Sequence, residues 1–352
     1  MSAPAAGRDG TVASRLAHPQ DEAPSGTVVD VDGAAVAVPV PSTHLHIYNV
    51  LSTLMAEGRL TPGGSLGRPL RILDIGCGDG SLIVNLTALA AADPACPAIE
   101  VHGFDVGEQG FRRDELIDAT VRALSLRHPA IDWSRRIRLF SERAAWDYPE
   151  GYFDAAVSNQ VLEHVTDLEG LLANIATCVR TGGISVHLFP MAHCIQEAHC
   201  RIPFAHWFGN FDHRVSWITL LSRLGIGRYA RDRLVLGHGD VRDHARKTAA
   251  YIQCWTAYRT FNEIARLCRG RGLALSYHFT KDLFFTKARH LTGLRSPRMY
   301  RRWNWIGLEW LSFMLLRHLS SATLVIAPVR YDIGARIAAE KASLRPSSGS
   351  AT

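Results

Sequence analysis

Lysine is scarce in this 352-residue sequence: of its 39 basic residues only four are lysine, at positions 247, 281, 287 and 341. The formal net charge is +6, yet the chain lacks the clustered basic face and the base-stacking aromatic motif that nucleic-acid binding normally requires. Its one concentration of basic residues runs from Arg289 to Arg302. We therefore expect no nucleic-acid partner.

Paired cysteines, a secretory signal and long apolar runs are also missing. The seven cysteines are scattered and contain no C-x-x-C pair, which predicts free thiols in a reducing compartment. The first residues carry Arg8 and Arg15 without the apolar segment of a signal peptide. No stretch reaches the roughly 18 uncharged apolar residues of a membrane span. These absences together predict a cytoplasmic protein.

The content of hydrophobic residues, 47%, is enough for a packed core, although the two ends are poor in large apolar groups. Residues 1–26 and 336–352 are rich in alanine, proline, glycine and serine, and we expect them to be disordered tails. Residues 28–40 indicate two short strands around the turn dipeptide Asp32-Gly33. Ser42 or Thr43 is then expected to cap a helix that runs to about Ala56.

From Leu70 onward, short apolar strand patterns alternate with helical patterns. LRILDI, IEVHGFD, IRLF, FDAAVSN and GISVHLF are typical of strands, and SLIVNLTALA, ELIDATVRAL and LEGLLANIATCV of helices. This alternation predicts a parallel sheet with helices on both faces. After Pro190 this alternation of strand and helix patterns stops for about 70 residues. Regular patterns are found again in a helix near Phe261 to Leu267, a strand at Leu273 to Phe279 and a final strand, ATLVIAPV.

A glycine-rich turn follows the first of these strands, in the segment LDIGCGDGS from Leu73 to Ser81. Glycines permit positive φ and let the backbone approach a ligand closely, although a purely structural strand-to-helix turn is the alternative. A nicotinamide-binding turn would have glycine where Ser81 stands and an acidic residue about 20 residues further on. Here Asp105 follows Asp74 by 31 residues. Asp74 and Asp79 would also repel a pyrophosphate, so the turn favours a cofactor with an amino group and a sulfonium and no phosphate.

The segment from Leu70 to Pro190 resembles the class I S-adenosylmethionine (SAM)-dependent methyltransferases in the order and spacing of its glycine loop, Asp105, Glu142-Arg143 and FDAAVSNQVLEHV. The resemblance implies a Rossmann-like, seven-stranded, mostly parallel sheet with an antiparallel final strand, and SAM as cofactor. Asp105 would accept both ribose hydroxyls, and Glu142 falls where the family commonly has an Asp that bonds adenine. Trp146 is expected either beside the adenine or sulfonium or in the core. The cofactor-binding residues that the resemblance implies are Asp74, Gly76, Cys77, Gly78, Asp79, Gly80, Asp105, Val106, Glu142, Arg143 and Asn159.

Methyl transfer chiefly requires alignment of the acceptor and exclusion of water. A base is needed only for an unactivated hydroxyl, and His164, just after FDAAVSN at the carboxyl edge of the sheet, is the candidate. The alternative for His164 is a structural hydrogen bond to backbone. Residues 27–190 are expected to form the SAM-binding core, and residues 191–258 a helical lid inserted after the fifth strand.

The predicted lid contains an E-x-H and a P-F-x-H-W pattern, which resembles methyltransferases associated with surface-polysaccharide and glycolipid pathways. Its ligand-type residues fit no structural zinc spacing, so we expect no metal. Candidate residues of the acceptor pocket are Glu163, His193, Glu197, His199, His206 and Trp207.

Residues 259–335 are expected to complete the core, with an amphipathic helix at 300–319. This segment has tryptophans at 303, 305 and 310 and begins with basic residues. Such a helix suits a membrane interface, and the alternative is that it packs on the core or on a dimer partner. The sequence thus predicts SAM-dependent methylation, on oxygen, of a small-molecule, glycan or glycolipid acceptor. The alternatives are a nicotinamide-dependent oxidoreductase on the same fold, a non-catalytic SAM-binding protein, and RNA methylation, which needs a basic face at the cofactor mouth. The oligomeric state is not predicted.

Overall fold

The computed structural model describes residues 26–31, 34–63, 67–106, 113–141, 143–235, 237, 239–301 and 306–328. The expected tails, 1–26 and 336–352, lie outside this part of the chain, except that Gly26 begins a strand. The predicted strand pair is confirmed as an antiparallel sheet of β1 (Gly26–Val31) and β2 (Ala34–Pro39). Its turn, Asp32-Gly33, is outside the described residues.

A central sheet of seven strands has the order β5-β4-β3-β6-β7-β9-β8. Strands β3 to β7 pair in parallel, whereas β9 lies antiparallel between β7 and β8. The predicted fold, a Rossmann-like and mostly parallel sheet, is confirmed. Because β4 and β6 lie on opposite sides of β3, the strand order reverses at β3. The ligand crevice is therefore expected at the carboxyl ends of these strands. The strands are β3 (Leu70–Ile75), β4 (Ile99–Val106), β5 (Ile137–Phe140), β6 (Phe153–Asn159), β7 (Val179–Phe189), β8 (Leu273–Ser276) and β9 (Ala322–Pro328).

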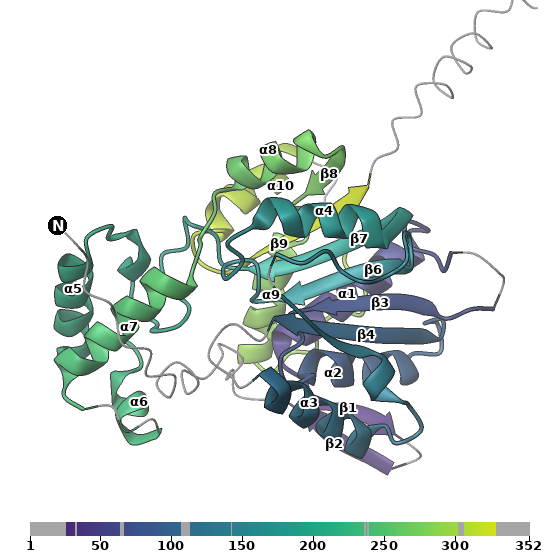
Figure 1. The fold of residues 1–352 in the computed structure, drawn as a ribbon, viewed down its shortest axis with the longest axis horizontal. Coiled ribbons are helices and arrows are strands. Elements are labelled where there is room, and N and C mark those ends of the chain that lie inside the picture. Colours follow the sequence, from purple (N-terminus) through teal and green to yellow (C-terminus); the bar gives the residue numbers. More distant parts are fainter. Residues whose placement is uncertain are drawn as a thin grey trace, which may run out of the picture.

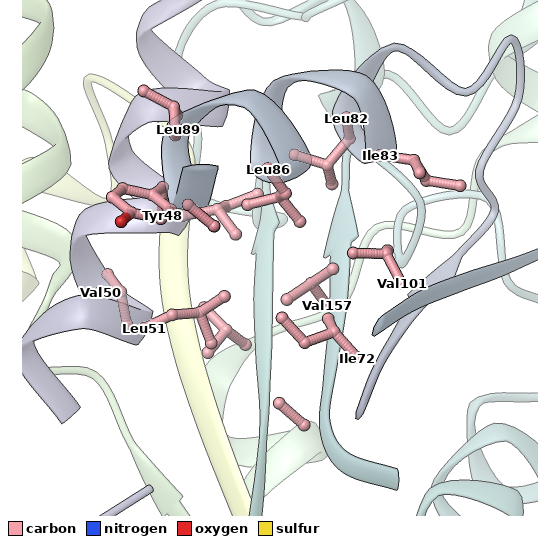
Figure 2. Close-up of a cluster of buried hydrophobic side chains, with 14 of the residues drawn as sticks. Tyr48, Val50, Leu51, Ile72, Leu82, Ile83, Leu86, Leu89, Val101 and Val157 are labelled. Atoms are coloured by element: carbon pink, nitrogen blue, oxygen red, sulfur yellow. The ribbon is translucent and has the colours of Figure 1, made fainter. Parts of the chain in front are cut away.

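Side chains of the strands alternate between two hydrophobic layers, one on each face of the sheet. In β3, Leu70 and Ile72 contribute to one layer, and Leu73 and Ile75 to the other, as the period of two requires. Figure 2 shows part of the first layer, where α2 side chains lie over those of the strands. The first layer is covered by α1 (Ser42–Ala56), α2 (Ser81–Ala91), α3 (Arg113–Arg127) and α9 (Thr280–Leu291), and the second by α4 (Leu168–Cys178), α8 (Phe261–Gly270) and α10 (Ile306–Leu316).

The predicted helix at 42–56 is confirmed as α1, but the expected cap is wrong. Pro41 occupies the N-cap position, and no side chain caps this end. Ser42 and Thr43 are instead buried residues of the first turn. Thr43 Oγ1 lies 3.5 Å from Asn159 Nδ2 at the end of β6, so the start of α1 faces the carboxyl edge of the sheet.

Residues 191–258 form a helical lobe with its own small core. After η3 (Ala205–Trp207), the lobe contains α5 (Phe211–Arg223), α6 (Tyr229–Val235) and α7 (Val241–Trp255). Val215 and Ile218 of α5 pack with Ala245 and Ala249 of α7. Figure 1 shows these three helices set apart from the sheet, beyond the carboxyl ends of β6 and β7.

The helix expected at 300–319 is shorter than predicted, since α10 covers Ile306–Leu316. Trp303 and Trp305 lie outside the described residues, and residues 295–301 are not helical. The physical reason is that the backbone of this stretch is hydrogen-bonded to side chains of α1. Asn49 donates to Pro297 O at 2.9 Å, and Tyr300 N–H donates to Thr53 Oγ1 at 2.9 Å. Across the described ranges, no helix is both long enough and apolar enough to cross a bilayer.

Candidate functional site

The glycine loop joins β3 to α2 at the carboxyl edge of the sheet. Gly76, Gly78 and Gly80 have φ values of 68°, 49° and 78°, in the left-handed region that favours glycine. A Cβ added at Gly76 would lie 2.7 Å from Val161 Cγ2, so a larger residue would not fit there. At Gly78 nothing lies within 4 Å of the Cβ position. The loop therefore presents bare backbone to the crevice.

Asp105, near the end of β4, holds this loop in place. Its Oδ2 accepts the N–H of Gly78 at 2.8 Å, and its Oδ1 accepts the N–H of Val106 at 2.7 Å. Burial raises the pKa of Asp105, and these two backbone donors oppose the rise. Each carboxylate oxygen still has a second lone pair, so Asp105 can accept further donors from a ligand.

Two buried oxygens beside the loop have no hydrogen-bond partner among the described residues: Asp74 Oδ2 in β3 and Asn159 Oδ1 at the end of β6. Burial is the main cause that raises the pKa of Asp74, followed by the negative charges of Asp105 and Asp79. A buried hydrogen-bond acceptor without a donor lowers the free energy of unfolding, so its presence needs an explanation. Both positions fit a ligand that supplies hydrogen-bond donors.

The turn that follows β6 contributes to two cavities. The smaller, about 130 Å³, is lined by residues that include Gly76, Phe104, Trp146 and His164. The larger, about 680 Å³, is lined by Asn159 and Gln160, by the start of α1, by the lobe segment 194–201 and by α9. The turn thus lies between a narrow cavity with aromatic walls, beside the glycine loop, and a wide cavity toward α9.

A buried hydrogen-bond network is centred on Glu197, whose side chain is 0% exposed. The carboxylate accepts His199 Nδ1 at 2.7 Å and the Tyr258 hydroxyl at 2.6 Å, and it also accepts the backbone N–H groups of His199 and Cys200, both at 2.8 Å. Burial alone would raise the pKa of Glu197, but the charge of His199 and these donors lower it overall. Glu197 is therefore ionised and fixes the lobe segment around it.

His164 joins this network from the core side. Its Nδ1 lies 2.6 Å from the carbonyl oxygen of Trp255, and its Nε2 lies 3.2 Å from Nε2 of His199. A carbonyl or a carboxylate only accepts, so both rings carry a proton on Nδ1. The two Nε2 atoms can then bond only if one is protonated and the other is not. Both nitrogens of His164 are therefore occupied by the protein.

Glu163 lies beside this network but is not part of it. Both of its carboxylate oxygens are buried without a hydrogen-bond partner in the described part of the chain. Burial raises the pKa of Glu163 to about 8, so the side chain is mostly protonated at neutral pH. Its backbone carbonyl accepts the N–H of Ala257 at 2.5 Å. The backbone of Glu163 thus ties the core to the end of the lobe.

Residues 48–233, more than half of the chain, match the family described as a methyltransferase domain. The chain belongs to this family. It is a SAM-dependent methyltransferase, and the family match supports methyl transfer over the nicotinamide alternative.

Several solved structures are similar to this methyltransferase at low sequence identity. YcgJ from Bacillus subtilis is 11% identical with a TM-score of 0.38, over 78% of this chain and 97% of that one. Geranyl diphosphate C-methyltransferase from Streptomyces coelicolor A3(2) is 15% identical with a TM-score of 0.40, over 93% and 100%. PKMT2 from Rickettsia typhi is 15% identical with a TM-score of 0.42, over 81% and 52%. Similarities this low identify no acceptor.

Most of the predicted cofactor residues lie at the carboxyl ends of β3, β4 and β6. Asp79 is exposed, and its Oδ1 accepts the N–H of Ser81 at 3.0 Å at the start of α2. Glu142 lies outside the described residues, and Arg143 is exposed and lines neither cavity. Trp146 is buried, with its ring centroid 4.6 Å from that of Phe104, and it also lines the smaller cavity.

None of the predicted acceptor-pocket residues lines the larger cavity. Glu163, Glu197 and His199 lie in or beside the buried network, whereas His193, His206 and Trp207 line an open recess of about 450 Å³ with Tyr258. Within the described ranges, no group of three or more His, Cys, Asp or Glu side chains is arranged to hold a metal ion. Residues of the larger cavity that sequence reasoning missed include Thr43, Gln160, Arg201, Lys287 and His290. The one available signal was Lys287, as one of only four lysines.

Proposed function

We propose that this enzyme transfers the methyl group of SAM to an oxygen atom of a small-molecule, glycan or glycolipid acceptor that binds in the larger cavity. The observation that carries the proposal is the position of the two cavities at the turn after β6, one beside the glycine loop and the other toward α9. Donor and acceptor would meet at this turn, at the carboxyl edge where open α/β sheets bind ligands.

The residues at the edge of the sheet suit the polar groups of SAM. The unpartnered oxygens of Asp74 and Asn159 would accept from its amino group, and the remaining lone pairs of Asp105 from its ribose hydroxyls. Phe104 and Trp146 would contact the adenine ring in the smaller cavity. When bound, SAM supplies an electrophilic methyl group on a positively charged sulfur. The role of the protein is then to align the acceptor and exclude water.

His164 would act as a positioning residue rather than as the general base. Its Nδ1 is bonded to Trp255 O and its Nε2 to His199, so it has no nitrogen left for an acceptor hydroxyl. Its ring still lines the smaller cavity. The hydrogen bonds would therefore fix the orientation of the cavity wall and connect it to the helical lobe, which we propose serves as the lid.

Contact with a membrane surface through α10 and the residues before it would suit a lipid-linked acceptor. Phe313 faces the core, whereas Ile306, Trp310 and Leu315 are 77%, 49% and 60% exposed. Exposed arginines at positions 289, 295, 298 and 301 lie close by in the sequence. Exposed apolar side chains flanked by arginines suit an interface with anionic lipid headgroups.

The cofactor assignment is tested by calorimetric titration with S-adenosylhomocysteine and, in parallel, with reduced nicotinamide adenine dinucleotide. We expect micromolar binding of the first compound alone. Replacement of Asp105 by Ala should weaken this binding at least about tenfold, because hydrogen bonds to a charged group contribute about 1.5–3 kcal/mol each. Asp147→Ala is the control, since that side chain is 99% exposed and should leave the affinity unchanged.

Folding of both variants is checked by thermal unfolding, and Asp105→Asn, which keeps the size of the side chain, is used if Asp105→Ala fails to fold. Unchanged affinity for S-adenosylhomocysteine in the Asp105 variant would refute the assigned role of this carboxylate. Binding of the nicotinamide compound alone would overturn the proposed function. Turnover with an identified acceptor separates an enzyme from a protein that only binds SAM.

A further inference from the structure

The larger cavity has an uneven distribution of charge. Three of its lining residues carry basic groups, namely Arg201 of the lobe and Lys287 and His290 of α9. Among the described residues that line it there is no aspartate or glutamate. Hydroxyl groups of Ser42, Thr43 and other residues supply further donors. In a partly enclosed space, where charges are less screened than in water, this arrangement favours an anion.

Apolar side chains form another part of the same wall. Phe284 and Leu291 come from α9, and Leu319 follows α10. Leu291 and Leu319 are also 85% and 60% exposed, so the apolar wall continues from the cavity to the outer surface. The cavity can therefore accommodate a molecule with both a charged group and a hydrocarbon part.

The backbone is strained at two points of this cavity. Gln160 and Arg201 have φ values of 57° and 55°, in a region that costs residues other than glycine roughly 1 kcal/mol or more. Both conformations are held by hydrogen bonds: Gln160 N–H donates to Leu188 O at 2.7 Å, and Arg201 N–H donates to Glu197 O at 2.9 Å. Such strain is typical of binding sites. The network around Glu197 thus fixes the segment that presents Arg201.

We propose that the larger cavity binds the anionic group, a phosphate or a carboxylate, of the methyl acceptor. Arg201, Lys287 and His290 surround that group, and Phe284, Leu291 and Leu319 contact the hydrocarbon part of the same molecule. This inference rests on the proposed function, because it names the chemical class of the acceptor in that site. It narrows the acceptor from any small molecule or glycan to an anionic amphiphile.

The test is calorimetric titration with n-octyl phosphate, octanoate and octyl β-D-glucoside, each kept below its micelle-forming concentration. We expect at least one anionic probe to bind at least tenfold more tightly than the neutral glucoside. Tighter binding of octyl phosphate identifies a phosphate-bearing acceptor, and tighter binding of octanoate a carboxylate-bearing one. The double variant Arg201→Gln/Lys287→Gln should lose at least tenfold in affinity for the anionic probe.

Lys247→Gln is the matched control, because Lys247 forms an ion pair with Asp243 at 2.9 Å on α7 and does not line the cavity. It should leave every affinity unchanged. Equal binding of neutral and anionic probes, no binding of either anion, or an unchanged affinity in the double variant would overturn the inference. Titrations with S-adenosylhomocysteine are run separately on each variant, so that a failure of cofactor binding, which concerns the proposed function, is distinguished from a failure of anion binding.

Discussion

A buried carboxyl group such as that of Glu163, which has no hydrogen-bond partner among the residues that the structure describes, is stable inside a protein only while it holds a proton. Its pKa in the folded chain is about 8, raised by burial from an ordinary value of 4.5. Between these two values the folded state keeps a proton that the unfolded state has lost. Raising the pH across this window therefore favours unfolding.

Replacement of Glu163 by Gln should remove this pH dependence. We expect the wild type to lose stability relative to Glu163→Gln as the pH rises from about 5 to 8, by at most about 1.4 kcal/mol for each pH unit. Denaturant unfolding of both proteins at several pH values measures the difference. The exposed Glu150 provides the control substitution, Glu150→Gln. A difference that stays constant with pH would contradict the protonated state of Glu163.

At the scale of single elements, α10 has an unusual distribution of polarity. The polar Glu309 lies on its buried side, where it forms an ion pair with His278, while Leu308, Trp310, Leu311 and Leu315 are exposed. The helix therefore has an apolar outer face in addition to Phe313, which packs in the core. A helix that only packed on the core would have a polar outer face.

Trp310→Ser combined with Leu315→Ser should weaken binding to anionic vesicles at least about tenfold, since each buried side chain of this size contributes about 1.5–3 kcal/mol. Sedimentation with phosphatidylglycerol-phosphatidylcholine vesicles measures the partition. The matched control is Leu234→Ser on α6, which removes another exposed leucine, 86% exposed, from the helical lobe. Equal loss in both variants, or no vesicle binding by the wild type, would count against membrane contact through α10.

At the scale of the whole molecule, the hydrogen bonds that join the core to the helical lobe include two described above. One links Nε2 of His164 to Nε2 of His199, here called the histidine pair, and the other runs from Ala257 N–H to Glu163 O. His164→Ala would remove the bonds to Trp255 O and His199 and leave part of the buried network without a partner. We expect amides of α7 to exchange with deuterium about 5- to 100-fold faster, which corresponds to roughly 1–3 kcal/mol.

Hydrogen exchange followed by mass spectrometry provides this measurement, and amides of β6 and β7 serve as the internal reference. His213→Ala, at an exposed histidine of α5, is the control and should change little. If exchange in α7 is the same in His164→Ala and the wild type, the histidine pair does not hold the lobe.

The strands, the helices that alternate with them and the glycine loop could be predicted from the sequence, because they depend on local patterns and on a contiguous motif. The antiparallel last strand was expected only from the resemblance to the methyltransferases. The larger cavity could not. It combines residues as far apart as Thr43, Gln160, Lys287 and Ser320, and no local pattern indicates that these segments meet. The error before α10 has the same origin, because hydrogen bonds from α1, distant in the sequence, hold Pro297 and Tyr300.

The position of β9 also has a consequence for how the chain is made. β9 is the last described strand in the sequence, yet it pairs with β7 on one side and β8 on the other. Until residue 328 has left the ribosome, β7 exposes an unpaired edge and β8 has no neighbour in the sheet. An open edge of this kind is prone to pair with other chains. Nascent chains of this protein should therefore depend on chaperones until synthesis has passed β9.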